Sequence, residues 1–303
     1  MKTTKQKGLT DKSELAFYIA LISIPVLQVI IFYFYVNFNS ITMSFFKYSM
    51  KDDTYTWNNF ANFVKFWDEL TNGQLVVKLL NSVYVWFFSS LLGTFLSVLF
   101  SYYIFKKFKG AKIFKFILFL PTVLPSILLA FMYKFFMNEA IPLVIENITG
   151  NPTSSLLGDP NLKFPLVVFY NVFVCFGAQI LIYSGAMDQI SPDILEAGQV
   201  DGVTPMREFF SLVIPMVLPT VSTFFIASVA TIFTNQANLY SFFGHLLENE
   251  YQTLGYYLFL LVNGDQYGED FYTYASALGI VCTLVAFPLT VLVRKLLTPK
   301  EEY

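Results

Sequence analysis

The chain has 303 residues, of which 55% are apolar, 19% are aromatic and only 13% are charged, and its formal net charge is −2. Soluble globular domains carry roughly 25% charged residues, so this composition excludes an ordinary soluble domain. The small net charge argues against nucleic-acid binding, which calls for a strongly basic face. Cys175 and Cys282 both lie in apolar runs, which predicts two small core residues rather than a disulfide or a metal site.

Hydropathy predicts six membrane-spanning helices. A bilayer core takes roughly 20 helical residues. Apolar runs of at least that length cover 15–38, 76–105, 113–137, 164–187, 209–234 and 271–293. We therefore expect an all-α integral membrane protein with a single six-helix domain over residues 15–293.

Lysine and arginine predict the orientation of these helices. Cytoplasmic segments carry an excess of both residues, and 13 of the 19 fall in the two tails and in the second and fourth connections. They are Lys2, Lys5, Lys7, Lys12, Lys106, Lys107, Lys109, Lys112, Lys115, Arg207, Arg294, Lys295 and Lys300. Both termini are thus expected in the cytoplasm, as tails over 1–14 and 294–303.

Three segments are expected on the outer side. Residues 39–75 form an aromatic and polar loop, whose rings belong either to an interfacial belt or to a docking surface for an extracellular partner. Residues 138–163 are rich in Pro, Gly, Asn and Ser, which indicates irregular turns. Residues 235–270 mix aromatic and acidic residues and contain neither Lys nor Arg.

The apolar cores of the six predicted spans contain no Asp, Glu or His. Proton-coupled transporters place such residues within their spans, and a membrane enzyme needs a catalytic cluster at one depth. The chain also has no phosphate-binding P-loop motif. We therefore predict no catalytic residue, no metal site and no cofactor in this chain. The class of protein that these exclusions leave is one that forms a translocation path. It is either a channel or one part of a pump in which another subunit supplies the energy.

One long polar connection, residues 188–212, lies on the cytoplasmic side. Ser191 is a good N-cap, Pro192 suits the first helical position and Asp193 complements the helix dipole. The helix is expected to run to about Val200, with Gly202 as its left-handed stop. Thr204-Pro205 repeats the cap-and-proline signal and starts a second short helix.

These two short helices look like a socket for another protein, although a solvated connector is the alternative interpretation. The small residues Ala197 and Gly198 predict a face that a partner's backbone can approach closely. Glu196, Asp201 and Glu208 are expected to offer acceptors to that partner.

The same residues carry a resemblance to a known family. Glu196-Ala197-Gly198, Asp201-Gly202 and Phe209, followed by Ile214-Pro215 and Leu218-Pro219, resemble the EAA loop of the membrane subunits of ABC importers fed by binding proteins. The Asp-Gly pair, the run Phe119–Ser126 and the run Asn59–Phe63 are similar to the carbohydrate-uptake branch, which includes the maltose-type permeases. The family's Gly-Gly-Pro segment is replaced here by Asn238–Gly244, which leaves the sugar class open.

The resemblance implies a type I ABC importer transmembrane fold and a multi-pass permease subunit of the bacterial inner membrane, forming half of a translocation path. The implied partners are a second homologous permease, two cytoplasmic ATPases that bind ATP and Mg²⁺, an extracellular solute-binding protein and a carbohydrate. The residues implied to couple to the ATPase are Glu196, Ala197, Gly198, Asp201, Gly202 and Pro215. The alternatives are the same architecture for a peptide, polyamine or phosphate, a self-contained channel, or a membrane-embedded enzyme.

Substrate contacts are predicted from neutral polar residues within or beside the apolar spans, since lipid leaves such groups unsatisfied. The candidates are Tyr170, Asn171, Gln179, Asn235, Gln236 and Asn238. Amides and aromatic rings suit a sugar, and the resemblance makes Asn171 and Asn235 the matching positions. Hydrogen bonding between helices is the alternative role for these side chains. Helix breaks are expected at Pro121, Pro125, Pro215 and Pro219.

Overall fold

The computed structural model describes residues 12–49, 52–263 and 270–297, and within them the side chains of Lys12, Ser13, Glu14, Cys175, Phe176, Ala178 and Asp270 lie outside the description. The described chain is almost entirely helical. Its elements are α1 (Lys12–Gln28), η1 (Val29–Tyr35), α2 (Val36–Met43), β1 (Phe46–Ser49), β2 (Thr54–Trp57), α3 (Ala61–Thr71), α4 (Gln74–Trp86), η2 (Phe87–Leu92), α5 (Gly93–Phe105), α6 (Ala111–Val123), α7 (Ser126–Phe135), η3 (Phe136–Ala140), α8 (Ile141–Thr149), α9 (Lys163–Met187), α10 (Pro192–Val200), α11 (Pro205–Glu208), η4 (Phe209–Val213), α12 (Ile214–Ala230), α13 (Leu239–Phe243), η5 (Asn249–Tyr251), α14 (Leu254–Asn263) and α15 (Asp270–Leu297).

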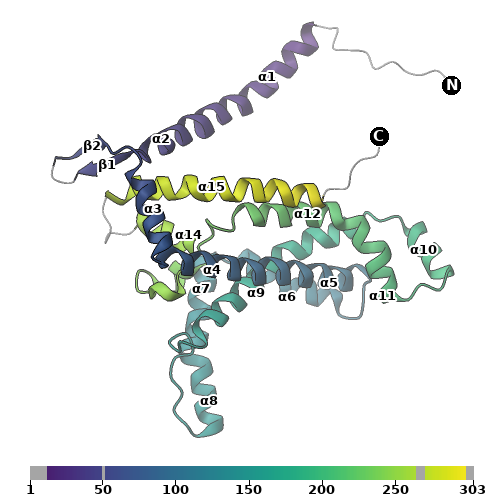
Figure 1. Ribbon diagram of the computed structural model, residues 1–303. Coiled ribbons are helices and arrows are strands. Elements are labelled where there is room, and N and C mark those ends of the chain that lie inside the picture. Colours follow the sequence, from purple (N-terminus) through teal and green to yellow (C-terminus); the bar gives the residue numbers. More distant parts are fainter. Residues whose placement is uncertain (1–11, 50–51, 264–269, 298–303) are drawn as a thin grey trace.

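The helices α4, α5, α6, α9, α12 and α15 run side by side as a bundle, and α1 slants away from it (Figure 1). α9 lies at its centre, between α5 and α6, while α12 packs on α15. One end of the bundle carries α10 and α11, and the other carries the β1–β2 hairpin, α3 and α14. The beginning of α1 and the end of α15 both lie toward the end with α10.

Six helices among the described residues are long and apolar enough to cross a membrane, which agrees with the predicted number. They are Leu15–Met43, Gln74–Phe105, Ser126–Thr149, Lys163–Met187, Pro205–Ala230 and Phe271–Leu297. The third prediction, 113–137, is wrong in detail, because its helix is interrupted. α6 ends at Val123, and Leu124 and Pro125 are extended, with ψ of 144° and 132°. Proline disfavours the helical region for the residue before it, which explains the break.

After this break the chain changes direction. α7, η3 and α8 form one continuous helical stretch that runs across the bundle rather than along it (Figure 1). The predicted irregular segment 138–163 therefore begins with ordered helix as far as Thr149, where Gly150 takes the left-handed conformation with φ of 72°.

The other three prolines expected to break helices do not. Pro121 and Pro219 lie inside α6 and α12, and Pro215 lies in the first turn of α12, directly after η4. A proline ring clashes with the carbonyl four residues earlier in an α-helix. For Pro215 this is Ser211, which lies in the π-helical segment η4, where the wider turn accommodates the ring.

The segment 39–75 is more ordered than predicted and contains a small two-stranded sheet, which is a local feature of the otherwise helical fold. β1 pairs antiparallel with β2, in a register that places Phe46 opposite Trp57 and Ser49 opposite Thr54. The buried Asn62 of α3 holds the hairpin, because its Nδ2 donates to the carbonyls of Ser44 at 2.7 Å and Phe46 at 2.9 Å.

Buried apolar residues form three clusters along the bundle. Cys282 lies 5% exposed in the cluster formed by α4, the residues after α12, α14 and α15, which confirms its predicted core position. The side chain of Cys175 lies outside the described residues.

The start of α14 touches the backbone that follows α12. A Cβ atom added to Gly255 would lie 2.4 Å from Asn235 O and 2.6 Å from Thr234 C. Since these are backbone atoms, no side-chain rotation relieves the clash. Glycine is therefore required for α14 to reach this position.

We expect Gly255→Ala to destabilise the protein by at least the roughly 1–3 kcal/mol typical of overpacked cores, because the backbone itself must move. Gly279→Ala in α15 is the matched control, since nothing lies within 4 Å of its added Cβ. Thermal unfolding of the two purified variants in detergent measures the difference. Equal melting temperatures would contradict this account of the contact.

A second contact closes the same end of the bundle. The Lys163 ammonium, at the start of α9, lies 2.8 Å from both carboxylate oxygens of Glu248. It also lies 4.8 Å from the centre of the Tyr251 ring. Lys163 is buried, whereas the Glu248 side chain is 56% exposed. The pair fastens the connection between α13 and α14 to the first turn of α9.

The hydrogen bonds from Lys163 lower the pKa of Glu248 below its ordinary value of 4.5. A carboxylate whose pKa is lower in the folded state stabilises fully above its unfolded pKa, and this contribution is lost as the pH falls through the folded value. We expect the melting temperature of the native protein to exceed that of Glu248→Gln at about pH 6, and the difference to shrink below about pH 4.5. A difference that stays constant down to about pH 3 would contradict the assignment.

Candidate functional site

A polar cavity of about 210 Å³ lies inside the bundle. Its walls come from α4 and η2, α9, the end of α12 with the residues after it, and the residue before α14. It is lined by Ser82, Val85, Trp86, Ser89, Ser90, Asn171, Val174, Ser228, Thr231, Ile232, Asn235 and Thr253. Among the described residues, the lining side chains carry hydroxyls, amides, one indole and three aliphatic groups, and none of them is charged.

Two walls of the cavity are joined by a direct hydrogen bond. Trp86 Nε1 donates to Ser228 Oγ at 3.2 Å, which connects α4 with α12. Directly after Trp86 the helix passes into the π-helical segment η2, which contributes Ser89 and Ser90 to the lining. Single π-helical turns inside α-helices are frequent at functional sites. The sequence reasoning missed this wall, although two adjacent serines in an apolar span carry the same signal as Asn171.

The two asparagines predicted as substrate contacts both line the cavity, and both bind the turn at Ala237. Asn171 Nδ2 donates to Val167 O at 2.8 Å and to Ala237 O at 2.9 Å. Asn171 Oδ1 accepts from Asn238 Nδ2 at 3.0 Å, and Asn235 Oδ1 accepts from Ala237 N at 2.8 Å. The amides therefore bridge α9 and the segment after α12, which is the alternative role that the sequence left open.

The bonded turn is unusual at Ala237. Ala237 and Asn238 have φ of 54° and 57°; asparagine tolerates this left-handed conformation, but it costs alanine roughly 1–2 kcal/mol. The hydrogen bonds from Asn171 and Asn235 offset this cost. Among the described residues, none accepts a hydrogen bond from Asn235 Nδ2, so this group can donate to a molecule in the cavity.

The other four predicted contacts do not line the cavity. Tyr170 is 2% exposed and packs against Tyr133 and Phe242, with ring centres 5.0 and 4.9 Å away. Gln179 Oε1 accepts from Ser97 Oγ at 3.1 Å, and thus connects α9 with α5. Gln236 has a buried Oε1 atom without a hydrogen-bond partner in the described part of the chain. Asn238 reaches the site only through Asn171.

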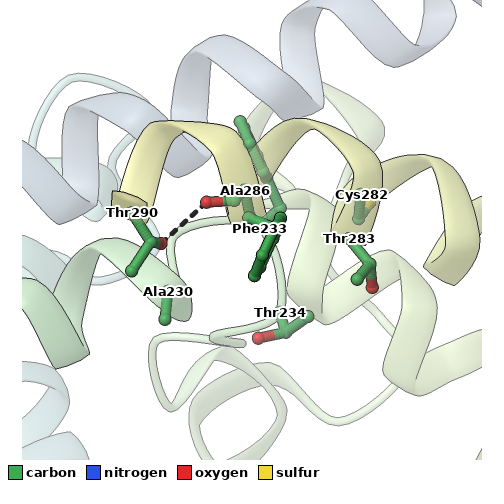
Figure 2. A pocket seen from close by; sticks show the side chains of 8 residues that line it. Ala230, Phe233, Thr234, Cys282, Thr283, Ala286 and Thr290 are labelled. Carbon is green, nitrogen blue, oxygen red and sulfur yellow. Dashed lines mark hydrogen bonds between the residues drawn. The ribbon is translucent and has the colours of Figure 1, made fainter. Parts of the chain in front are cut away.

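A second cavity, of about 220 Å³, lies between the end of α12 and α15 (Figure 2). Its polar groups are threonine hydroxyls that bond within their own segments. Thr290 Oγ1 donates to Ala286 O at 2.7 Å, as the dashed line in Figure 2 shows, and Thr283 Oγ1 donates to Gly279 O at 2.8 Å. This cavity therefore suits apolar groups, and the first one is the candidate for a polar solute.

The predicted coupling element, residues 188–212, lies at the end of the bundle near the ends of α5 and α15 (Figure 1). α10 begins and ends as predicted. Ser191 Oγ accepts from Asp193 N at 3.3 Å, and Pro192 occupies the first turn. Gly202 has φ of 73°, and Val203 N donates to Gly198 O at 2.9 Å while Gly202 N donates to Gln199 O at 3.1 Å. These two bonds form a Schellman motif, which closes the helix.

The exposed face of the coupling element carries both charge and apolar surface. Glu196, Ala197 and Asp201 are exposed. The apolar surface comes from Val200 and Met206, which are 87% and 68% exposed. Pro215, the last predicted coupling residue, is also exposed, in the first turn of α12.

Two predicted details of this element are wrong. Gly198 is buried, and an added Cβ would lie 2.9 Å from Leu212 Cδ1, so its small size admits a side chain of the same protein rather than a partner. Glu208 is only 4% exposed and therefore offers no acceptor to a partner. Both residues lie on the inner side of their short helices, and tertiary packing rather than local sequence decides which side that is.

Asn171→Ala is expected to destabilise the protein by about 1–3 kcal/mol, because it leaves the buried Ala237 carbonyl without its donor. Ala237→Gly should recover part of this loss, since glycine adopts positive φ without strain. Asn263→Ala is the control, because within the described residues the hydrogen bond of Asn263 Nδ2 goes to Phe259 O of its own helix. Thermal unfolding of the single and double variants measures these effects. Equal losses from Asn171→Ala and Asn263→Ala would overturn the proposed role of Asn171.

The sequence profile of the family described as "Binding-protein-dependent transport system inner membrane component" matches residues 89–302. The chain therefore belongs to this family, and with its six apolar helices it is a multi-pass membrane protein. The resemblance drawn from the EAA-type residues is confirmed at the level of the family.

Three comparisons define this placement further. The multiple sugar-binding transport system permease protein MsmF of Streptococcus mutans is 25% identical over 63% of this chain and 64% of its own length. The maltose/maltodextrin transport system permease protein MalF of Salmonella typhimurium is 26% identical over 42% of this chain and 25% of its own length. The probable ABC transporter permease protein YurN of Bacillus subtilis is 23% identical over 92% of this chain and 96% of its own length. The matches thus span less than two thirds of MsmF and MalF.

The fold is that of a solved importer. A chain of a bacterial ABC transporter involved in the import of the acidic polysaccharide alginate superposes with a TM-score of 0.75 at 19% identity, over 94% of this chain and 96% of that one. A chain of the bacterial alginate ABC transporter in complex with an alginate pentasaccharide-bound periplasmic protein gives a TM-score of 0.76 at 18% identity, over 95% of this chain and 96% of that one.

Proposed function

We propose that this chain is a permease subunit of an ATP-driven ABC importer and forms half of the translocation path for a carbohydrate. The observation that carries the proposal is the capped coupling element, which displays Glu196, Ala197 and Asp201 at one end of a bundle of apolar helices. A cytoplasmic position for this end is supported by the lysine and arginine excess around it. Both termini are then cytoplasmic, since the described ends of α1 and α15 point the same way.

The proposed partners follow from what the chain has and lacks. Two cytoplasmic ATPase subunits bind ATP and Mg²⁺ and receive α10 in a groove. An extracellular binding protein delivers the solute at the opposite end. A second, homologous permease completes the path, because the cavity of about 210 Å³ is smaller than the roughly 300–1,000 Å³ of most ligand sites. The complex of the alginate transporter with its periplasmic protein supports this assembly.

A carbohydrate is the solute that the cavity supports best. Its hydroxyl and amide groups form hydrogen bonds with sugar hydroxyls, and the Trp86 indole offers an apolar face. In the part of the chain that the structure describes, the lining has no charged side chain to bind a phosphate or a polyamine. Asn235 and Asn171 are the proposed contacts, and the names of MsmF and MalF, a sugar and a maltose permease, support this class. Tyr170, Gln179, Gln236 and Asn238 lie outside the lining and support the site indirectly.

In the proposed mechanism, ATP drives the two ATPases together, and their movement is passed through α10 to the spanning helices. The helices then alternate between inward-open and outward-open states as rigid bodies, biased by nucleotide and by the loaded binding protein. The Schellman cap at Gly202 keeps the end of α10 helical, because a helix that frays at its end cannot transmit the movement of the ATPases.

We expect Glu196→Lys to abolish uptake linked to ATP hydrolysis while the complex still assembles, because the substitution reverses charge on the docking face. Gly202→Val should have the same effect, since valine cannot adopt a φ of 73° without strain. The test uses the complex isolated through a tag on this chain, reconstituted in vesicles and supplied with its binding protein and a panel of oligosaccharides.

Glu146→Lys is the matched control, because Glu146 is exposed in α8, toward the other end of the bundle. Transport at the native rate by Glu196→Lys and Gly202→Val would contradict the coupling role. Conduction or catalysis by the isolated chain without ATPase partners would overturn the proposed function.

A further inference from the structure

A buried ion pair lies where the coupling element meets the bundle. Glu208, the last residue of α11, accepts hydrogen bonds from Lys106 Nζ at 2.9 Å to Oε1 and 3.1 Å to Oε2. The side chains of Lys106 and Glu208 are 20% and 5% exposed. Lys106 is the C-cap residue of α5, so the pair joins the end of α5 to the end of α11.

A tyrosine one turn earlier on α5 reinforces the same contact. The Tyr102 hydroxyl lies 3.0 Å from Pro205 O and 3.2 Å from Glu208 Oε1, and its proton is shared between these acceptors. The Tyr102 ring packs on Phe209, with the ring centres 4.9 Å apart. Two side chains of α5 thus hold the first residue of α11, its last residue and the residue that follows.

α5 leads directly from this contact to the cavity. Gln74–Phe105 is one continuous helical stretch that includes η2, whose serines line the cavity. Along the way α5 is fastened to α9 by two fully buried serines. Ser97 Oγ lies 3.1 Å from Gln179 Oε1, and Ser101 Oγ donates to Ile180 O at 3.1 Å.

We propose that Tyr102, Lys106 and Glu208 form a clamp that fixes the coupling element to α5 in one position, so that movement of α10 and α11 reaches the cavity wall through α5. The clamp itself rests only on the geometry, whereas its role in transmission rests on the proposed function. Glu208 and Lys106 are positioning residues in this scheme.

The chemistry of the clamp is better suited to fixing the position of α11 than to increasing the stability of the fold. Replacing a buried ion pair with apolar residues of similar volume is often neutral or stabilising, so the pair is weak evidence for a stabilising role. Its hydrogen bonds are directional, however, and one carboxylate meets two donors spaced four residues apart on α5. Only one placement of α11 lets its carboxylate accept hydrogen bonds from both donors. An apolar contact would allow α11 to shift along α5.

Three variants distinguish a role in positioning α11 from a role in stability. Lys106→Met/Glu208→Met removes the pair and keeps the volume, so the fold is expected to remain while the position is lost. Lys106→Glu/Glu208→Lys reverses the pair and should restore the position. Lys112→Met, at an exposed lysine in the first turn of α6, is the matched control.

The position is measured by electron spin resonance distances between labels at Leu99 of α5 and Val200 of α10, in the full chain lacking Cys175 and Cys282. Both label sites are exposed, by 37% and 87%. We expect the distance distribution of the methionine double variant to be about twice as broad as that of the native chain, and the reversed pair to restore a narrow one. A distribution unchanged in the methionine double variant would overturn the clamp.

Transmission is measured in the reconstituted complex as solute imported per ATP hydrolysed. We expect this ratio to fall about tenfold in the methionine double variant, with basal hydrolysis retained and the ratio recovered by the reversed pair. Broadened distances with an unchanged ratio would overturn the transmission role. Failure of the native complex to couple uptake to ATP would instead defeat the proposed function, and the distances would still decide the clamp.

Discussion

A polar group inside the bilayer must find its partner within the protein, because lipid offers none. The chain meets this constraint in two ways. Many hydroxyls bond to a carbonyl one turn earlier in their own helix, as Ser97 does with Gly93 at 2.6 Å. Amides and charged groups instead reach across to other segments, as Asn171 does with Ala237. The second kind of bond fixes the arrangement of the helices, and it is concentrated at the cavity and at the end of α5.

These two places differ in the kind of constraint they impose. At the cavity, two asparagines hold Ala237 in a left-handed conformation that it would not adopt alone. Backbone strain of this kind is typical of functional sites, where surrounding bonds over-determine it. At the end of α5, Lys107 likewise has a positive φ of 51°, but the groups that join the two helices there are the buried Glu208 carboxylate and its donors Lys106 and Tyr102.

The features that could be predicted from sequence are those set by local chemistry. The number of spans follows from hydropathy, and both ends of α10 follow from Ser191, Pro192 and Gly202, since caps depend on neighbouring residues. The break at Pro125 is equally local. The hairpin had a signal as well, because Phe46–Ser49 and Thr54–Trp57 are short runs rich in aromatic and β-branched residues around an Asp-containing turn.

The remaining features depend on contacts between residues far apart in the chain. Nothing near Glu208 in the sequence shows that its carboxylate turns inward, because Lys106 lies about a hundred residues away. The same holds for Gly198, whose small size serves Leu212, and for Gly255, whose need for glycine comes from the backbone of Asn235. The predicted substrate contacts included Asn171 and Asn235, which line the cavity, together with Tyr170 and Asn238, which do not, because depth in a span does not define which face of the helix is inward.

The placement of the π-helical segments distinguishes two routes from the coupling element into the bundle. α11 passes directly into η4, Phe209–Val213, before α12 begins. A π-helical turn interrupts the regular ladder of hydrogen bonds, and such interruptions are where helices bend. The route through α5 contains regular helix from Gly93 to Phe105 and reaches the π-helical segment η2 only at the cavity wall. A displacement of α11 can therefore be absorbed by bending at η4, while the same displacement applied at Lys106 is carried along a stiff helix and first meets a compliant turn at Ser89 and Ser90.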